Sequence, residues 1–156
     1  MITSVRRLIG MPVVFREKEL GYVEQAYAGE GKLEGVVIRR GMGSARWLAA
    51  EEIMMKRDHL IASRKPADLP KLCRKRAERV CMENGQYAGE VSDWILLDGN
   101  LRFAAVEVSP GPIYRLLGRC GYACEFHRDQ PSGSVIVPRL LSWSQLKRQL
   151  GEEDDR

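Results

Sequence analysis

The order of apolar and polar residues along the chain predicts a series of short β-strands separated by turns. Apolar stretches rich in β-branched residues recur, and glycine, proline or short polar runs stand between most of them. This pattern is typical of a small β-barrel or sandwich. In the first half, strands are expected at 12–15, 21–27, 33–39, 46–49 and 59–61, and in the second half at 80–82, 89–97, 101–108 and 135–137.

Two segments of the chain also resemble each other when they are aligned at an offset of 68 residues. Gly21, Val23, Gly31 and Leu33 fall without a gap on Gly89, Val91, Gly99 and Leu101. The shared glycines open a strand or stand in a turn, where the backbone makes the strongest demands on residue type. The hairpin of residues 89–101, with its Asp98-Gly99 turn, is the clearer copy. The pattern predicts a tandem duplication of one β module.

These elements divide the chain into four segments. Residues 1–63 form a first barrel-like module, 64–78 a basic linker, 79–141 a second module, and 142–156 a C-terminal helix with an acidic tail. Ser142 and Gln145 have the spacing of a capping box, and Gly151 follows the expected helix. A capped helical turn is expected within 109–119, and residues 71–78 could add another. The predicted fold class is all-β, with two small barrels packed together, since a module of about 60 residues has only a marginal core of its own.

The motifs of both copies resemble the PRC-barrel family. The first carries Gly21-Tyr22-Val23-Glu24-Gln25 before Gly31-Lys32-Leu33, and the second carries Gly89-Glu90-Val91-Ser92-Asp93 before Gly99-Asn100-Leu101. The first copy departs from the usual aspartate at Gln25. The resemblance covers residues 3–62 and 79–141. Members include the cytoplasmic domain of the photosynthetic reaction-centre H subunit, the C-terminal domain of a ribosome maturation factor, and small proteins of spore-forming bacteria. The resemblance implies a docking or adaptor module and carries no catalytic signature.

Charge and composition give expectations about the cellular location of the protein and about where its positive charge lies. The 156 residues carry a net charge of +4, and no uncharged apolar run approaches the about 20 residues of a membrane helix. The first residues lack the features of a secretory signal, so we expect a cytoplasmic protein without a membrane span. The linker region is strongly basic, and a set of seven cations there faces two acids, Asp68 and Glu78. The cations are Arg64, Lys65, Lys71, Arg74, Lys75, Arg76 and Arg79.

Candidate catalytic and metal-binding chemistry is sparse. Cys120, Cys124 and His127 form the tightest group of possible zinc ligands, but structural zinc sites usually use two cysteine pairs with shorter spacing. Cys73 and Cys81 have seven residues between them, more than such a pair allows, and four cysteines in a cytosolic chain are expected to be reduced thiols. No metal and no cofactor are therefore expected.

No known catalytic motif is present in the sequence. His59 and His127 belong to different modules, and Asp93 and Asp98 lie on or beside a hairpin, where aspartate commonly serves a turn. The sequence contains no phosphate-binding loop, dinucleotide fingerprint or nucleophile elbow. We therefore expect a protein that is not an enzyme.

The sequence favours a non-catalytic cytosolic adaptor that docks a protein partner, and it leaves a homo-oligomer open. One alternative is an RNA- or ribosome-associated factor that uses the basic linker, with further phosphate contacts from Arg6, Arg7, Arg39, Arg40 and Arg46. Trp47 is the one aromatic residue close to such a stretch, and it is interpreted as a core residue. A second alternative is a small zinc-binding regulator that uses the cysteines.

Overall fold

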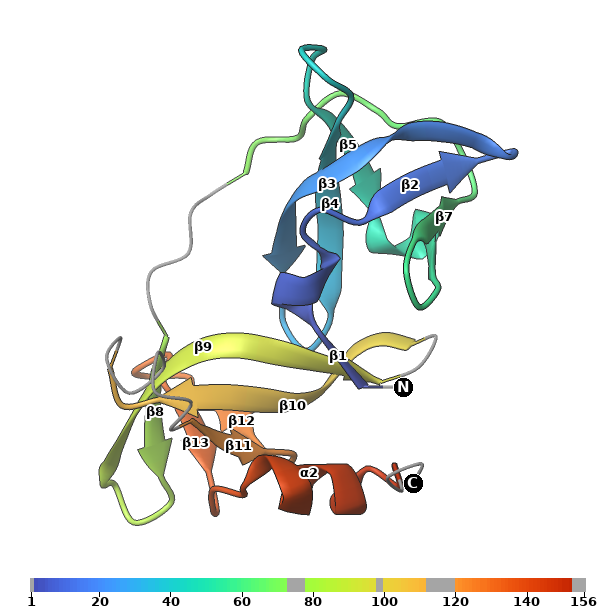
Figure 1. The fold of residues 1–156 in the computed structure, drawn as a ribbon. Helices are drawn as coiled ribbons and strands as arrows, with labels where there is room; N and C mark the ends of the chain where they lie inside the picture. The colour runs from blue at the N-terminus through green and yellow to red at the C-terminus, as the bar shows by residue number, and fades with distance from the viewer. Residues whose placement is uncertain (1, 73–77, 98–99, 112–119, 153–156) are drawn as a thin grey trace. The chain divides into compact units, whose positions relative to one another are not determined.

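The computed structural model describes residues 2–72, 78–97, 100–111 and 120–152, and strands dominate them. The predicted all-β class with two barrel-like units and a short C-terminal helix is confirmed (Figure 1). Contacts divide the chain into two compact units. The first comprises Thr3–Cys73 with Leu96–Phe103, and the second comprises Ile2, Arg74–Ile95 and Ala104–Arg156. No helix in the described residues is long and apolar enough to cross a membrane.

The first unit contains a six-stranded curled sheet. Its strands are β2 (Pro12–Phe15), β3 (Lys18–Ala28), β4 (Leu33–Arg39), β5 (Arg46–Ala49), β6 (Ile53–Met55) and β7 (Leu60–Ala62). They lie side by side in the order β5-β4-β3-β2-β7-β6. Two 3-10 turns accompany them, η1 (Val5–Leu8) and η2 (Ala50–Glu52). The strand predicted at 59–61 begins one residue later, and β6 was not predicted because its two methionines lack the β-branched signal.

A second, larger sheet belongs mainly to the second unit. Its strands are β8 (Arg79–Met82), β9 (Tyr87–Leu97), β10 (Asn100–Ser109), β11 (Gly121–Ala123), β12 (His127–Arg128) and β13 (Val135–Val137), and β1 (Ile2–Ser4) pairs with β9. The end of β9 and the start of β10 (Leu96–Phe103) are counted with the first unit. The strand order is β11-β10-β9-β8-β13-β12. Ser109 ends β10 and does not begin a helical turn, and most of the turn predicted at 109–119 lies outside the described residues.

The two sheets follow the same path. In each, the first strand pairs antiparallel with the second and parallel with a late strand: β2 with β3 and β7, and β8 with β9 and β13. The register slips once after Val13 in β2 and once after Val80 in β8. The strand order expected for two copies of one module is therefore present in both units.

Gly21 and Gly89 occupy the same demanding place in the two sheets. Both have φ of +139°, and Gly21 pairs with Val13 as Gly89 pairs with Val80. A Cβ at Gly21 would lie 2.5 Å from the Arg39 carbonyl oxygen, and one at Gly89 would lie 2.4 Å from that of Ser109. Only glycine fits such a position, which explains why both survive in the repeat.

The cores consist mainly of the inward residues of these strands. In the first unit the fully buried side chains include Leu8, Val13, Val36, Ile38, Leu48 and Leu60, and in the second Val80, Ile95, Val106, Val137 and Leu146. Leu146 lies on α2 (Trp143–Gln149). The predicted capping box is confirmed: Ser142 Oγ accepts from Gln145 N at 3.2 Å, and Gln145 Oε1 accepts from Ser142 N at 2.8 Å. Leu72 was expected on a helix, but Lys71 and Leu72 have no regular structure and residues 73–77 lie outside the described part.

Candidate functional site

One side of the sheet in the first unit faces away from the barrel core, and we call it the outer face. Across the antiparallel ladder, Tyr22 pairs with Arg39, Gln25 with Val37, and Tyr27 with Gly35. Trp47 of β5 pairs with Val37 on the other side of β4. Directly paired residues share one side of a sheet, so these seven residues form the outer face. The alternate pairs, Val23 with Ile38 and Val36 with Leu48, point into the core.

An aromatic pair occupies one end of the outer face. The rings of Tyr27 and Trp47 meet edge to face, with centroids 6.1 Å apart, although their strands are separated by β4. The Trp47 side chain reaches across β4 above Gly35, where an added Cβ would lie 2.4 Å from Trp47 Cζ2. The indole is half-buried, so the interpretation of Trp47 as a core residue is wrong. A glycine beneath a cross-strand aromatic ring leaves the ring on the sheet surface.

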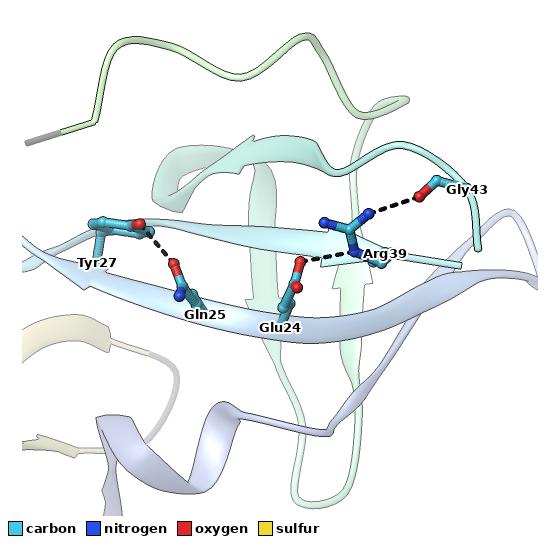
Figure 2. A network of polar contacts seen from close by, with 5 residues as sticks. All are labelled: Glu24, Gln25, Tyr27, Arg39 and Gly43. Carbon is cyan, nitrogen blue, oxygen red and sulfur yellow. Dashed lines mark hydrogen bonds and ion pairs between the residues drawn. The ribbon is translucent and has the colours of Figure 1, made fainter. Parts of the chain in front are cut away.

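A network of polar contacts runs along β3 and β4 beside these rings (Figure 2). Arg39 Nε donates to Glu24 Oε2 at 3.0 Å, and its Nη1 donates to the carbonyl oxygen of Gly43 at 2.9 Å. Tyr27 Oη donates to Gln25 Oε1 at 2.6 Å. The register of β3 shifts between Val23 and Gln25, at Glu24. Because of this shift, the Glu24 side chain can reach Arg39 although it directly follows the inward-facing Val23. The network fixes the Arg39 guanidinium and makes this part of the face nearly neutral.

The other end of the outer face is more exposed. The side chain of Tyr22 is 50% exposed and lies opposite Arg39. The loop that follows β4 carries Met42, which is fully exposed. Gly43 N donates to the carbonyl oxygen of Arg40 at 2.9 Å, and this bond closes the loop. The described part of the first unit thus carries tyrosine, tryptophan and arginine along one side of its sheet, with an exposed methionine in the loop after β4.

The edge of β5 is paired with a residue from the linker. Trp47 N donates to Ala67 O and Ala67 N donates to Trp47 O, both at 2.9 Å. Arg46 forms an ion pair with Asp68. The next outward amide, Ala49 N, donates to Glu52 Oε2 at 3.2 Å. The beginning of the predicted basic linker therefore lies along the sheet.

The corresponding face of the second unit is arranged differently. Tyr122 of β11 pairs with Glu107 of β10, and its hydroxyl donates to Glu107 Oε2 at 3.1 Å. Ser92 Oγ donates to Glu107 Oε1 at 2.6 Å. The ring of Trp143, at the start of α2, lies 5.1 Å from that of Tyr122 between centroids. A helix of the chain itself thus covers part of this face.

The candidate metal ligands do not form a site. All three residues of the proposed zinc group, Cys120, Cys124 and His127, are described and half-buried or exposed. Within the described ranges, no three histidine, cysteine or acidic side chains lie close enough together to hold a metal ion. Cys81 is a free thiol, and Cys73 lies outside the described residues.

The remaining ionisable candidates make local contacts. Asp93 is buried and its Oδ1 accepts from Trp94 N at 2.8 Å, while Asp98 lies outside the described residues. His59 Nδ1 lies 2.7 Å from Asp58 Oδ1, and this hydrogen bond lowers the pKa of Asp58. A backbone hydrogen bond and then Lys32 lower the pKa of Glu51.

A shallow hollow of about 260 Å³ also lies within the first unit. Its lining residues are Lys32, Leu33, Ala50, Glu51, Ile53, Leu101 and Arg102. Lys32 Nζ lies 3.4 Å from Glu51 Oε1, so the Lys32 cation already has a carboxylate partner.

The basic linker is only partly described. Arg74, Lys75 and Arg76 lie outside the described residues. The guanidinium of Arg79 lies over the ring of Tyr87, 5.2 Å from its centroid. Arg64 pairs with Glu52 at 3.1 Å. Arg64 and Arg79 thus have partners within their own units.

Sequence reasoning missed Tyr22 and Tyr27 as members of the site. Both belong to an expected strand. The side of the sheet that each one faces depends on the shift in register after Val23, and no local sequence pattern predicts this shift. The glycine at 35, inside a β-branched strand, was the one available signal for a close approach above it. Comparison with family models and with curated proteins finds no match to this chain.

Proposed function

We propose that this chain is a non-catalytic adaptor that docks a protein partner on the outer face of its first unit. The observation that carries the proposal is the row formed by Tyr22, Arg39, Tyr27 and Trp47 on one side of three strands. Protein interfaces are enriched in tyrosine, tryptophan, arginine and methionine, and these types supply most binding hot spots. Here they lie together with Met42 at the adjoining loop.

The polar network favours tight docking. Glu24 and the Gly43 carbonyl oxygen hold Arg39 in place before any partner arrives. A side chain that is already ordered loses less conformational entropy on binding, so more of its contact energy appears as affinity. The Glu24–Arg39 pair also leaves the face close to neutral, which suits a protein surface better than a polyanion.

The contrast between the two units supports a docking role for the first. Tyr22 pairs with Pro12, and at the corresponding place of the second sheet Glu90 pairs with Arg79. Tyr122, which corresponds to Trp47, already has Trp143 of α2 against its ring. The exposed aromatic row is therefore specific to the first unit among the described residues.

We also propose that both units are versions of one PRC-barrel-like module acting in the cytoplasm. The shared strand order, the shared register slip and the glycines Gly21 and Gly89 support a duplication. The docking function that the PRC-barrel resemblance implies agrees with the composition of the outer face. After duplication, one copy would keep an exposed face while the other acquired a helix over its edge strand.

RNA binding is a second candidate, favoured by one observation. The structure brings Tyr27 beside Trp47, with Tyr22 at the other end of the same face, and Arg39, Arg40 and Arg46 lie at the same strands and their loop. Bases stack on such rings, and arginines accompany them in single-strand binding proteins. Glu24 and Asp68 neutralise two of these arginines, so the protein partner is the better supported reading.

A capture experiment with two single variants tests the docking role. Full-length chain is immobilised, proteins bound from the source cytosol are identified with and without nuclease, and the dissociation constant of the purified partner is measured. We expect Tyr22→Ala to weaken binding at least tenfold, about 1.4 kcal/mol, as for a hot-spot residue. Tyr87→Ala is the matched control, because Tyr87 is also 50% exposed but belongs to the second unit.

Two results would contradict the proposal. Equal effects of Tyr22→Ala and Tyr87→Ala would place the interface elsewhere. Loss of all captured protein after nuclease treatment would mean that nucleic acid bridges the interaction, which promotes the RNA candidate.

A further inference from the structure

Residues 65–70 lie along the edge of β5, and we call this segment the strap. Ala67 alone makes ladder hydrogen bonds there, two of 2.9 Å with Trp47. Pro66 and Pro70 have no amide proton, so neither can extend the pairing. Asp68 adds an ion pair with Arg46. The strap therefore imitates a very short added strand.

The chain before the strap is fixed more firmly. Ser63 N donates to the carbonyl oxygen of Glu52 at 2.8 Å, and Arg64 Nη1 lies 3.1 Å from Glu52 Oε1. After this anchor, Ala67 and the three residues that follow are exposed, and the Asp68 side chain is 94% exposed. Few apolar contacts therefore oppose the local opening of the strap. Segments with little buried surface and with exposed hydrogen bonds are the ones that open most easily.

The second unit provides an internal comparison. Tyr122 and Leu141 form the same pair of backbone bonds, with N–O distances of 2.9 and 2.6 Å. Leu141 is buried, and α2 begins two residues later and buries Leu146 completely. In the second unit, buried core side chains thus stabilise this edge pairing. In the first unit, only surface contacts stabilise it.

We propose that the edge of β5 is a docking slot for an extended peptide segment of the protein partner, and that the strap occupies this slot in the free protein. This inference rests on the proposed function and specifies how the partner binds. The peptide would add a strand at Trp47, which also belongs to the outer face, so one partner could use both. Addition of a strand to an exposed edge is a recurring mode of peptide recognition.

The residues of the strap specify the chemistry of the peptide. The residue opposite Trp47 must keep its amide proton, and it is the small Ala67 in the strap. The next residue carries a carboxylate, because Arg46 is paired with Asp68 there. The slot is short, since Glu52 Oε2 already accepts from Ala49 N. The slot therefore fits an extended segment with a small residue followed by an acid.

The strap competes with the partner because it is tethered beside the slot. A tethered segment acts at an effective concentration on the order of millimolar, so a weak pairing still lowers the apparent affinity of a free peptide. The partner's apparent dissociation constant is its intrinsic value divided by the fraction of open slots. Removal of the strap should therefore strengthen peptide binding without any new contact.

Hydrogen exchange on the intact chain tests the strap itself. The amide of Trp47 is protected by Ala67, and the amide of Tyr122 by Leu141, in otherwise matching places. We expect the Trp47 amide to exchange at least tenfold faster than the Tyr122 amide, after correction for intrinsic rates. Equal protection would overturn the proposal, because the strap would then be as permanent as its counterpart.

Peptide binding tests the slot. The probe is a fluorescent synthetic peptide with the sequence of residues 64–70, and the proteins are full-length wild type, Ala67→Pro and Asp68→Lys. Ala67→Pro removes the amide donor, and Asp68→Lys replaces an ion pair with repulsion from Arg46. We expect both variants to bind the probe about tenfold more tightly than wild type, about 1.4 kcal/mol. Asp58→Lys is the matched control, since it reverses the charge of another exposed aspartate, whose ion pair is with His59 and not with a residue of β5.

The outcomes separate this inference from the docking function. A probe with proline in place of its alanine should lose binding to all proteins. If neither variant binds the probe more tightly than wild type, the slot is refuted. If a captured partner is weakened by Tyr22→Ala but unchanged by Ala67→Pro, docking on the outer face stands and the strap has no part in it.

Discussion

At the scale of single residues, Gly35 determines where Trp47 can lie. The absence of a side chain at Gly35 lets the indole cross β4 and reach Tyr27. A Cβ there would also lie 2.5 Å from the carbonyl oxygen of Leu48, which is backbone and has little room to move. One glycine therefore sets both the spacing of two strands and the position of the aromatic pair.

We expect Gly35→Ala to destabilise the first unit by about 1–3 kcal/mol, the usual cost of overpacking a filled site. Urea unfolding followed by Trp fluorescence and by circular dichroism measures the change. Gly29→Ala is the control, because its nearest atom would lie 3.3 Å away, and we expect a change within about 0.5 kcal/mol. If the two substitutions cost the same, the close approach of the indole to β4 would be wrong.

The residue scale also shows what the sequence could and could not predict. Gly21 and Gly89 were identified correctly because their backbone angle excludes other residues, and a repeat makes such a constraint visible twice. The partners of Trp47 were missed. A shift of one position in the register of β3 determines which side of the sheet Tyr22 and Tyr27 face. The alternation of apolar and polar residues along the strand does not show such a shift.

At the scale of elements, the turn between β2 and β3 is strained. Arg16 and Glu17 both have positive φ, 48° and 67°, which is unusual for residues with side chains. The corresponding turn of the second unit is longer, residues 83–86; of Asn84 and Gly85 only Gly85 has positive φ, 88°, and Asn84 Oδ1 accepts from Gln86 N at 2.9 Å. Two central residues with positive φ favour asparagine followed by glycine.

Replacing Arg16-Glu17 with Asn-Gly should therefore stabilise the first unit by about 1 kcal/mol. Relief of two left-handed residues gains about 1–2 kcal/mol each at most. Loss of the Arg16 contact with the Phe15 ring, 5.1 Å from its centroid, offsets about 0.5–1 kcal/mol of this. The shift in urea midpoint measures the result, and Gly85→Ala, at φ of +88°, should move it the opposite way. A destabilised Asn-Gly variant would show that the turn is not strained.

The elements that the sequence predicted share a clear signal. Strands β2, β4, β5 and β13 combine apolar or β-branched residues with turn residues at both ends, and their bounds were predicted correctly. Strands β1, β6, β11 and β12 were missed because each has only two or three residues and, unlike the Val-Ile-Val run of β13, none consists of β-branched residues throughout. Their place in the sheet comes from pairing with longer strands, which is tertiary information.

At the scale of the whole molecule, the number of basic residues in the sequence overstates the positive charge that is available to bind a nucleic acid. The linker looks like a continuous basic segment, yet Arg64 is bound by Glu52 and Arg79 lies over Tyr87. In the first unit, Arg39 and Arg46 have carboxylate partners as well. A cation that is already paired gains less from a phosphate, because the existing pair must be separated first. The net charge of +4 is therefore a poor guide to affinity for nucleic acid.

A salt titration with a labelled single-stranded RNA tests this conclusion on the intact chain. Each phosphate contact should lower log affinity by about 0.7 per unit of log salt, so the slope counts the cations involved. We expect a shallow slope and no measurable binding at physiological salt. Replacing Arg74, Lys75, Arg76 and Arg79 together with glutamine should leave folding intact, since exposed charges add little stability. It should also reduce the slope more than Arg40→Gln does, which is the matched single change on the outer face. Tight binding at physiological salt that the fourfold replacement abolishes would make RNA the partner of this chain, with the linker as its site.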